Sequence, residues 1–514
     1  MVLAENIIHS LPPFGAPDCE SDLAILGEAA YSRYYFHSTH FNQASLDPSV
    51  YLILGRRGAG KTALTKFFSF QKTIPNCMEI AIDEPVAFHE VMSRIAEQTS
   101  LNRELQIPQL VKIWEYIVWT AIFYQLRNKD LRIRAACSFA DDEGLSKVIR
   151  SILQSLLSKY LGVNNTVSDA LDKIFYSTTF REAKQAVLEF ARKRPLIVAL
   201  DTLEKYSVSD ERLMTTVAAL VEFAALFSRE FAPKNIHIKV FLMDEMFPYL
   251  IEDYISNTLK YVKNEVYLHW KPKDLMRMIC WRLFQSLRLK GICKLRAEQI
   301  DWDSYRDVKE KIWKPYFGEC LDDGCETQEK TFPYILRHTH LRPRQLIVLC
   351  NSVAEEALRN QNFPNFSLRN IVMGVQNASD SLADEVFNAY SSVYPKASRI
   401  ADALSGISPV FQAKELDKRA HQTASQWQGD YSPYRFRQFV AELGIVGRVR
   451  RKDDTTGIIE ADFEYFKKGR LMLSTDDLCV IHPMFYTKLN VTIQQKLHVY
   501  PFPDHEEFVS LKHP

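Results

Sequence analysis

The stretch Tyr51-Leu-Ile-Leu-Gly-Arg-Arg-Gly-Ala-Gly-Lys-Thr-Ala63 joins a short apolar run to a glycine-rich loop. Glycines at positions 55, 58 and 60 permit positive φ angles, so backbone N–H groups approach an anion where a side chain would collide. The spacing from Gly55 to Lys61-Thr62 is that of a phosphate-binding loop, in which the lysine reaches the β- and γ-phosphates and the hydroxyl ligates Mg²⁺. The stretch therefore predicts a nucleotide site.

The flanking sequence supports this prediction on both sides. Residues 51–54 have the apolar pattern of a short buried strand, and residues 62–70 are suited to a helix whose N-terminal dipole faces the anion. The residues expected to contact the nucleotide are Gly55, Arg56, Arg57, Gly58, Ala59, Gly60, Lys61, Thr62 and Ala63.

A second apolar run, Pro195-Leu-Ile-Val-Ala-Leu-Asp201, predicts a buried strand that ends in a carboxylate. Such a strand is typical of a Walker B motif, in which Asp201 holds Mg²⁺ together with Thr62. The alternative is a plain helix N-cap. The position after Asp201, where many such ATPases carry a glutamate base, is Thr202. Glu204 is then either the base that reaches the γ-phosphate or a first-turn helix residue.

Two further motifs follow along the chain. Residues 236–244 form another apolar run that ends in Asp244-Glu245, and this position suits either a γ-phosphate sensor or a plain strand followed by a helix cap. Pro343 suits the first turn of an amphipathic helix, with Arg342 and Arg344 on either side of it.

Together these motifs resemble the AAA+/STAND branch of P-loop ATPases. The run Leu54-Gly-Arg-Arg-Gly-Ala-Gly-Lys-Thr-Ala-Leu64, the Trp-containing helix at residues 110–126 and a late Ile481-His-Pro-Met-Phe485 resemble bacterial P-loop ATPases often linked to defence against phage. The resemblance implies ATP and Mg²⁺ as cofactors, and it implies that Arg342 or Arg344 touches the γ-phosphate; the alternative is a solvent-exposed pair. The catalytic residues it implies are Lys61, Asp201, Glu204, Arg342 and Arg344.

Composition limits the class of protein. A net charge of +1 over 514 residues argues neither for nor against nucleic acid, because local patches decide that. Nine scattered cysteines suit a reducing cytoplasm, and Cys320 and Cys325 alone are a poor zinc signature. The longest apolar run, residues 111–126, contains charges and is too short to span a membrane. We expect a cytoplasmic protein with no membrane partner.

The predicted fold class is α/β: a P-loop parallel sheet with a helical insertion, then a helical lid and a C-terminal winged-helix domain. The aromatic helix expected at residues 23–35 would pack beside the nucleotide base, and the polar segment 294–332 is expected to be a peripheral excursion. The expected ranges are 1–45 for the lead-in, 46–265 for the ATPase core with its insertion at about 85–190, 266–394 for the lid, 395–495 for the winged helix and 496–514 for a tail.

The winged-helix prediction rests on three helical patterns, 397–404, 410–424 and 434–443, followed by short strands at 445–452, 458–466 and 478–482. Such modules place a helix in the major groove and basic loops on phosphates, although a winged helix can also face a protein. The candidate nucleic-acid contacts are Arg435, Arg437, Arg448, Arg450, Arg451 and Lys452.

Two functions are compatible with these patterns. The first is an ATP-hydrolysing switch or motor that acts on DNA in a bacterial, antiviral system. The second is a nucleotide-gated scaffold that forms a homo-oligomer or recruits a separate effector protein without binding DNA. Met243 and Thr202 occupy positions where faster ATPases carry polar or acidic residues, and this favours slow turnover.

Overall fold

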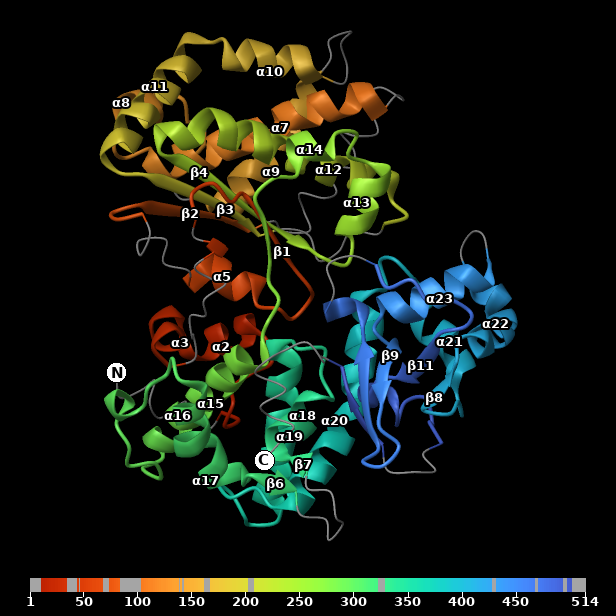
Figure 1. Cartoon of the computed structure of the whole chain (residues 1–514). Helices are drawn as coiled ribbons and strands as arrows, with labels where there is room; N and C mark the ends of the chain where they lie inside the picture. The colour runs from red at the N-terminus through yellow and green to blue at the C-terminus, as the bar shows by residue number, and fades with distance from the viewer. Residues whose placement is uncertain are drawn as a thin grey trace. The chain divides into compact units, whose positions relative to one another are not determined.

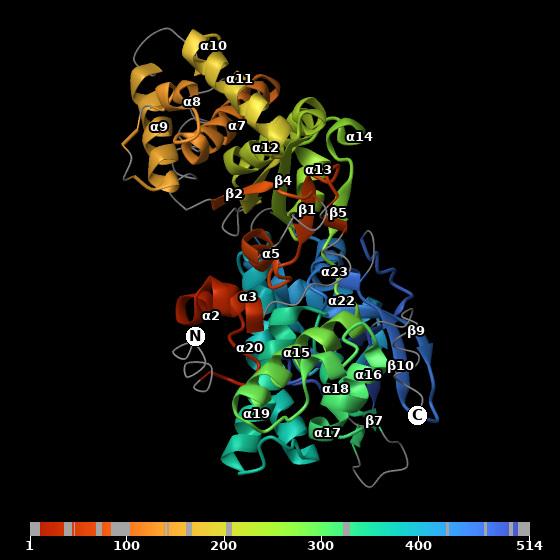
Figure 2. The same cartoon turned by 90° about the vertical axis from the view of Figure 1, so that its left-hand side faces the viewer.

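The chain folds as two compact units. The computed structural model describes residues 11–34, 44–45, 47–67, 74–83, 103–137, 139–140, 143–160, 167–201, 208–321, 329–427, 431–466, 470–492 and 497–501. The parallel-sheet unit comprises Thr39–Arg57 and Lys61–Leu268, and the C-terminal unit comprises Met1–Ser38, Gly58–Gly60 and His269–Pro514. Figures 1 and 2 show the helices and strands of each unit.

A five-stranded sheet with the order β2-β3-β4-β1-β5 forms the centre of the parallel-sheet unit. All four strand pairings are parallel. The inner strands of such a sheet are largely apolar because helices cover both of its faces. Every residue of β4 is buried, His237 and Lys239 included. The strands are β1 (Leu52–Gly55), β2 (Met78–Asp83), β3 (Leu196–Asp201), β4 (Ile236–Met243) and β5 (Glu265–Tyr267). The three strands expected from the apolar runs are confirmed.

Between β2 and β3 the described residues are helical, as expected. Trp119 of this insertion packs edge-to-face on Phe231, with ring centroids 5.2 Å apart, and Trp114 donates its indole N–H to the Thr216 carbonyl. The insertion thus shares the core of the sheet unit; the first part of the expected insertion, residues 85–102, lies outside the described residues. The elements are α7 (Arg103–Leu126), α8 (Leu131–Ala135), α9 (Leu145–Tyr160), α10 (Val167–Phe175) and α11 (Thr178–Lys193), packed on α12 (Glu211–Phe231).

Helices cover both faces of the sheet. Figure 1 shows α7 and α12 on one face and α5 (Lys61–Phe67) on the other. Within the described ranges, no helix combines the length and apolarity that a membrane span requires.

In the C-terminal unit, Pro343 lies in the first turn of a helix, as expected, and Pro272 has the same position in an earlier helix. The expectation of a peripheral excursion at 294–332 was wrong, since Val308, Ile312, Trp313 and Phe317 are buried. The segment passes from α16 through a π-helical turn, Lys309–Trp313, into α17. Because of this turn, the four buried residues are four, one and four positions apart. This spacing departs from the 3.6-residue period of an α-helix, so the pattern is hard to recognise in the sequence. The helices are α15 (Pro272–Leu289), α16 (Tyr305–Val308), α17 (Lys314–Phe317), α18 (Thr331–Leu336), α19 (Pro343–Arg359) and α20 (Leu368–Ala389).

Between residues 397 and 500, the part of the chain that the structure describes forms a second five-stranded sheet, of order β12-β10-β9-β11-β8, with three α-helices beside it. The helix expected from residue 410 was wrong at its start, because Val410 begins β8 and pairs with Val480 of β11. The elements are α21 (Ala397–Ala401), β8 (Val410–Gln412), α22 (Lys414–Ala420), α23 (Pro433–Glu442), β9 (Val446–Lys452), β10 (Ile458–Asp462), β11 (Leu478–Ile481) and β12 (His498–Tyr500).

The lead-in segment is tied to the C-terminal unit by a buried ion pair. Gly27, with φ of 73°, ends α2 (Cys19–Leu26) before α3 (Glu28–Tyr34), so the single helix expected at 23–35 was wrong. The Arg282 guanidinium donates to the Phe14 carbonyl at 2.8 Å and to Asp22 Oδ2 at 3.2 Å. Asp22 is fully buried, and this burial raises the pKa of its carboxyl even though Arg282 lowers it.

We predict that Asp22→Ala lowers the free energy of unfolding of the C-terminal unit by about 3–5 kcal/mol, because it leaves the Arg282 charge buried without its carboxylate. Glu20→Ala, on the exposed face of the same helix, should change it by less than about 0.5 kcal/mol. Urea denaturation followed by circular dichroism measures both. Equal effects of the two substitutions would contradict a specific ion pair.

Candidate phosphate-binding site

The loop between β1 and α5 has the backbone that phosphate binding requires. Strand β1 ends at Gly55 and α5 begins at Lys61, as the sequence predicts. Gly58 and Gly60 have φ of 82° and 95°, in the region that residues with a Cβ rarely adopt. A Cβ at Gly58 would also lie 3.0 Å from the Arg344 Cβ, whereas one at Gly60 would meet no atom within 4 Å.

The Lys61 side chain folds back onto the start of this loop. Its side chain is 4% exposed, and Nζ donates to the carbonyls of Gly55 at 2.8 Å and Arg56 at 3.3 Å. Thr62 follows in the first turn of α5, and α5 packs against β3. Lys61 and Thr62 thus begin the helix that follows the loop, and the N-terminus of a helix carries backbone N–H groups that can meet an anion.

Asp201 lies at the same edge of the sheet. It is the last residue of β3 and pairs with Phe241 of β4, while Gly55 pairs with Met243 of the same strand. Because β4 lies between them, β3 and β1 are two inter-strand spacings apart, a distance of about 10 Å. The partly exposed carboxylate thus ends its strand on the side where α5 begins. Thr202 and Glu204 lie outside the described residues.

Two acidic residues after β4 anchor the start of the loop. Asp244 donates its N–H to the Gly55 carbonyl at 3.2 Å, and its carboxylate lies 3.5 Å from Arg56 Nε. Glu245 Oε1 accepts the N–H of Arg57 at 2.9 Å. The sequence position of Asp244 suits a phosphate sensor, but in the structure its N–H and its carboxylate contact Gly55 and Arg56 of the phosphate-binding loop. The sequence signal that was missed is the match between two adjacent arginines and two adjacent carboxylates.

The tip of the loop, Gly58–Gly60, is grouped with the C-terminal unit, and its contacts there involve α19 and Trp270, two residues before α15. The N–H of Arg344 donates to the Gly58 carbonyl at 3.4 Å, and the Trp270 indole N–H donates to the Ala59 carbonyl at 2.9 Å. Arg344 Nη1 also lies 3.6 Å from Glu385 Oε1 of α20. Sequence reasoning missed Trp270 and Glu385, which have no motif around them.

The two lid arginines occupy different environments. Arg342 is the N-cap residue of α19 and only 2% exposed, so the solvent-exposed alternative was wrong for this residue. Arg344 is the one that the structure brings to the loop tip. Its helix packs closely on α20, since a Cβ at Gly374 would lie 2.5 Å from the Val353 Cα.

The basic residues expected to contact nucleic acid are mostly occupied within the chain. On α23, Arg437 pairs with Asp417, and the Arg435 guanidinium lies 5.4 Å from the Trp427 ring centroid. On β9, Arg450 Nε lies 2.7 Å from Asp462 Oδ1 and Arg448 lies 3.7 Å from the same carboxylate.

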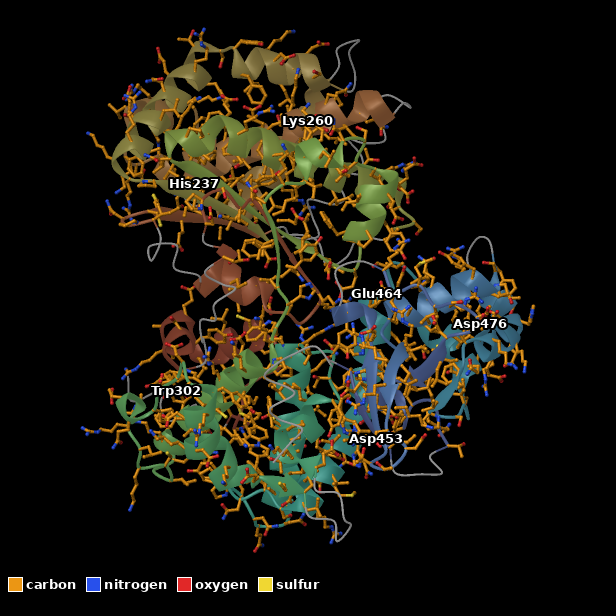
Figure 3. The ribbon with its side chains drawn as sticks, viewed as in Figure 1. His237, Lys260, Trp302, Asp453, Glu464 and Asp476 are labelled. Atoms are coloured by element: carbon orange, nitrogen blue, oxygen red, sulfur yellow. The ribbon has the colours of Figure 1, made fainter. Side chains whose placement is uncertain are left out.

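The turn between β9 and β10 is acidic. Lys452 Nζ lies 2.7 Å from Asp454, and Asp453 accepts hydrogen bonds from Thr455 that lower the pKa of its carboxyl to about 2 (Figure 3). Arg451 is exposed at the end of β9. The candidate wing thus presents mixed charge, with Arg451 as its clearest cation.

The residues at the loop suit a magnesium ion bound together with a nucleotide. In the part of the chain that the structure describes, no group of three or more His, Cys, Asp or Glu residues is arranged to hold a metal. Mg²⁺ usually takes one or two protein oxygens and completes its shell with phosphate oxygens and water. Thr62 and Asp201 offer an oxygen set of this kind.

Comparisons with known proteins agree with a helical region in the C-terminal unit. Residues 273–386 match the family model described as the FunZ-associated C-terminal helical domain, which covers α15 to α20. A search of curated protein sequences found no match.

Two solved structures of the Aeropyrum pernix ORC2 protein are similar to this chain, each at 13% identity. The form with ADPNP and ADP has a TM-score of 0.33 and covers 86% of this chain and 88% of that one. The ADP form has a TM-score of 0.27 and covers 88% of both chains. Similarities at these TM-scores carry no inference about function.

We predict that Glu245→Ala weakens ATP binding about tenfold or more, because the Arg57 N–H loses an ionised acceptor that fixes the loop. Glu245→Gln keeps an acceptor oxygen and should bind ATP within about threefold of the wild type. Isothermal titration calorimetry measures both. Unchanged affinity in the alanine variant would show that the loop keeps its conformation without this contact.

Proposed function

We propose that this chain is an Mg²⁺-dependent ATPase that uses ATP as a switch or motor in a bacterial system acting on nucleic acid. The observation that carries the proposal is the Gly55–Thr62 loop, with its two positive-φ glycines and the Lys61 ammonium, at the carboxyl edge of a parallel sheet. This is the edge at which open α/β sheets bind their ligands. A role in defence against phage rests on the sequence resemblance alone.

Each proposed role follows from the chemistry of its side chain. Lys61 neutralises the β- and γ-phosphates, and Thr62 and Asp201 supply oxygens to Mg²⁺. The ion, when bound, offsets charge that develops on the transferred phosphoryl group. Glu204 is proposed to orient the attacking water.

Arg344 is proposed to contact the terminal phosphate. Its backbone lies against Gly58 at the loop tip, and Glu385 sits beside its guanidinium. An arginine placed here gains a stronger partner when a phosphate is present, so it responds to the difference between ATP and ADP. Arg342, buried at the helix start, is proposed to support the position of that helix.

The C-terminal sheet with α21, α22 and α23 is proposed to be a winged-helix domain that contacts DNA. The order of three helices followed by β9, β10 and β11 supports this assignment. Arg435 and Arg437 on α23 and Arg451 on β9 are the proposed phosphate contacts.

The second candidate function is a nucleotide-gated scaffold, and the ion pairs of this domain favour it. Arg437, Arg448, Arg450 and Lys452 each face a carboxylate of the same domain. A DNA phosphate would have to compete with these carboxylates. A protein surface of mixed charge, in contrast, complements the pattern as it stands.

We predict that Lys61→Ala abolishes ATP binding and that Asp201→Asn retains binding but loses Mg²⁺-dependent turnover. The measurement is ATP hydrolysis by purified protein with and without duplex and single-stranded DNA, with Lys61→Ala as the blank. Stimulation by DNA supports the switch or motor on nucleic acid. A slow rate that ignores DNA supports the scaffold, and hydrolysis by Lys61→Ala equal to the wild type would refute the ATPase proposal.

If the domain contacts DNA, Arg451→Ala should reduce the log–log dependence of the binding constant on salt by about 0.9, the slope of one phosphate contact. Lys418→Ala, which removes an exposed lysine of α22, serves as the matched control. Fluorescence anisotropy at several salt concentrations measures both slopes. The same slope in the Arg451 variant and the wild type would remove the wing from the DNA interface.

A further inference from the structure

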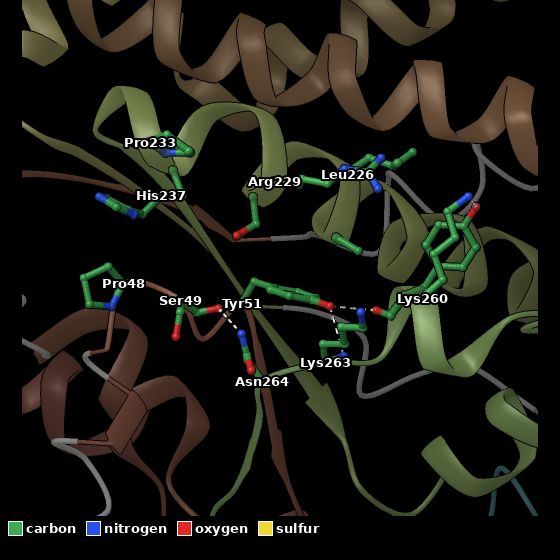
Figure 4. A pocket seen from close by; sticks show the side chains of 14 residues that line it. Pro48, Ser49, Tyr51, Leu226, Arg229, Pro233, His237, Lys260, Lys263 and Asn264 are labelled. Carbon is green, nitrogen blue, oxygen red and sulfur yellow. Dashed lines mark hydrogen bonds between the residues drawn. The ribbon is translucent and has the colours of Figure 1, made fainter.

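A pocket lies at the opposite edge of the parallel sheet from the phosphate-binding loop. Its volume is about 490 Å³, and its walls come from the residues before β1, the end of α12, the start of β4 and the segment before β5 (Figure 4). Because the strands are parallel, these amino-terminal ends share one edge, and Gly55 lies at the other. The volume falls within the range of small-molecule sites.

The floor of this pocket is aromatic and rigidly held. The side chains of Tyr51 and Tyr261 are buried. The Tyr51 hydroxyl donates to the Tyr261 carbonyl at 2.9 Å and accepts the N–H of Lys263 at 3.0 Å. Burial raises the pKa of Tyr51, so it remains a neutral phenol at neutral pH. A flat apolar group would find a fixed surface here.

The rim of the pocket is cationic. Arg229, Lys260 and Lys263 line it with exposed side chains, and no Asp or Glu is among the lining residues. Lys260 Nζ donates to the Tyr261 hydroxyl at 2.8 Å, which keeps its charge close to the aromatic floor. Of the nearby carboxylates, Asp47 accepts from Ser49 at 2.8 Å and Glu265 raises the pKa of Tyr51. An anion in this pocket would therefore meet only cationic and neutral side chains among the lining residues.

His237 adds a buried imidazole ring at the start of β4, between Pro48 and Pro233 in Figure 4 and within the sheet unit in Figure 3. The residue is 7% exposed, and its Nδ1 has no hydrogen-bond partner among the described residues. Burial, with the Lys239 charge, lowers the pKa of His237 to about 4. The imidazole ring is therefore neutral at neutral pH.

The wall next to His237 is fixed by Lys239. This lysine is fully buried, and its ammonium donates to the carbonyls of Asp47 and Val50, directly before β1. The segment that carries Pro48 and Ser49 is thereby held against β4. A pocket with both walls fixed is suited to selective binding, because little ordering is needed when a ligand enters.

We propose that this pocket binds a small aromatic anion, such as an aryl phosphate. The aromatic body lies on the Tyr51 and Tyr261 floor, and the phosphate meets Lys260 and Lys263 at the rim. Inorganic phosphate alone leaves the floor uncovered. An uncharged aromatic compound leaves the rim cations without a partner.

The test uses 1-naphthyl phosphate as the probe and isothermal titration calorimetry as the readout. The full-length Lys61→Ala variant is the starting protein, so that the probe does not report on the phosphate-binding loop. We expect one saturable site, with inorganic phosphate and 1-naphthol each binding about tenfold or more weakly. Because the loop lysine is already absent, the result does not depend on the proposed ATPase.

Two pocket variants and one control complete the test. Lys260→Ala with Lys263→Ala removes the rim charge, and Ala225→Trp fills the space; each should weaken probe binding about tenfold or more. Lys147→Ala, which removes an exposed lysine on the helical insertion, should leave the affinity unchanged. Circular dichroism checks that the variants fold.

The proposal would be overturned by three results. These are no saturable binding of the probe, equal binding by the wild-type pocket and the double-lysine variant, or equal affinity for 1-naphthyl phosphate and 1-naphthol. The second result would show that the probe binds elsewhere on the protein. The third would show that apolar contact alone holds it.

Discussion

The positive φ angles of Gly58 and Gly60 are the constraint on which the candidate site depends. A loop in this conformation is stable only where its neighbours hold it. Asp244 and Glu245 hold residues 55–57, while Trp270 and Arg344 hold the carbonyls of Ala59 and Gly58. The contacts come from segments far apart in the sequence, so the loop is a product of the tertiary structure as much as of its own glycines.

Contacts between residues far apart in the sequence also stabilise the C-terminal unit, where charged side chains are buried in pairs. Glu329 accepts hydrogen bonds from Arg337 at 2.8 Å and from the Tyr500 hydroxyl at 3.1 Å, and His498 lies 3.0 Å away. Burial alone raises the pKa of a carboxyl, but Arg337 and His498 outweigh it and lower the pKa of Glu329 to about 2. This network ties β12 to the region before α18. Removal of one partner from such a cluster costs more than the cluster contributes as a whole.

Charge pairing also changes the view of the candidate DNA-binding surface. The arginines of β9 alternate along a strand, which in the sequence reads as a basic stripe. In the folded chain, Asp462 on the neighbouring strand faces two of them. The pocket at the amino-terminal edge of the parallel sheet contrasts with this surface, because there Arg229, Lys260 and Lys263 line space that a ligand can enter.

The sequence by itself determined the elements whose signals are local. The glycine spacing of the loop, the apolar runs of β3 and β4 and the proline at the start of α19 each depend on neighbouring residues, and the structure has all of them. Three features depended on tertiary contacts instead: the burial of Trp313 through a π-helical turn, the strand at Val410 and the roles of Glu245, Trp270 and Glu385. The pocket at Tyr51 and His237 belongs with these. Its residues are spread over more than 200 positions, and only the parallel order of the strands places them together, because parallel pairing aligns all amino-terminal ends at one edge.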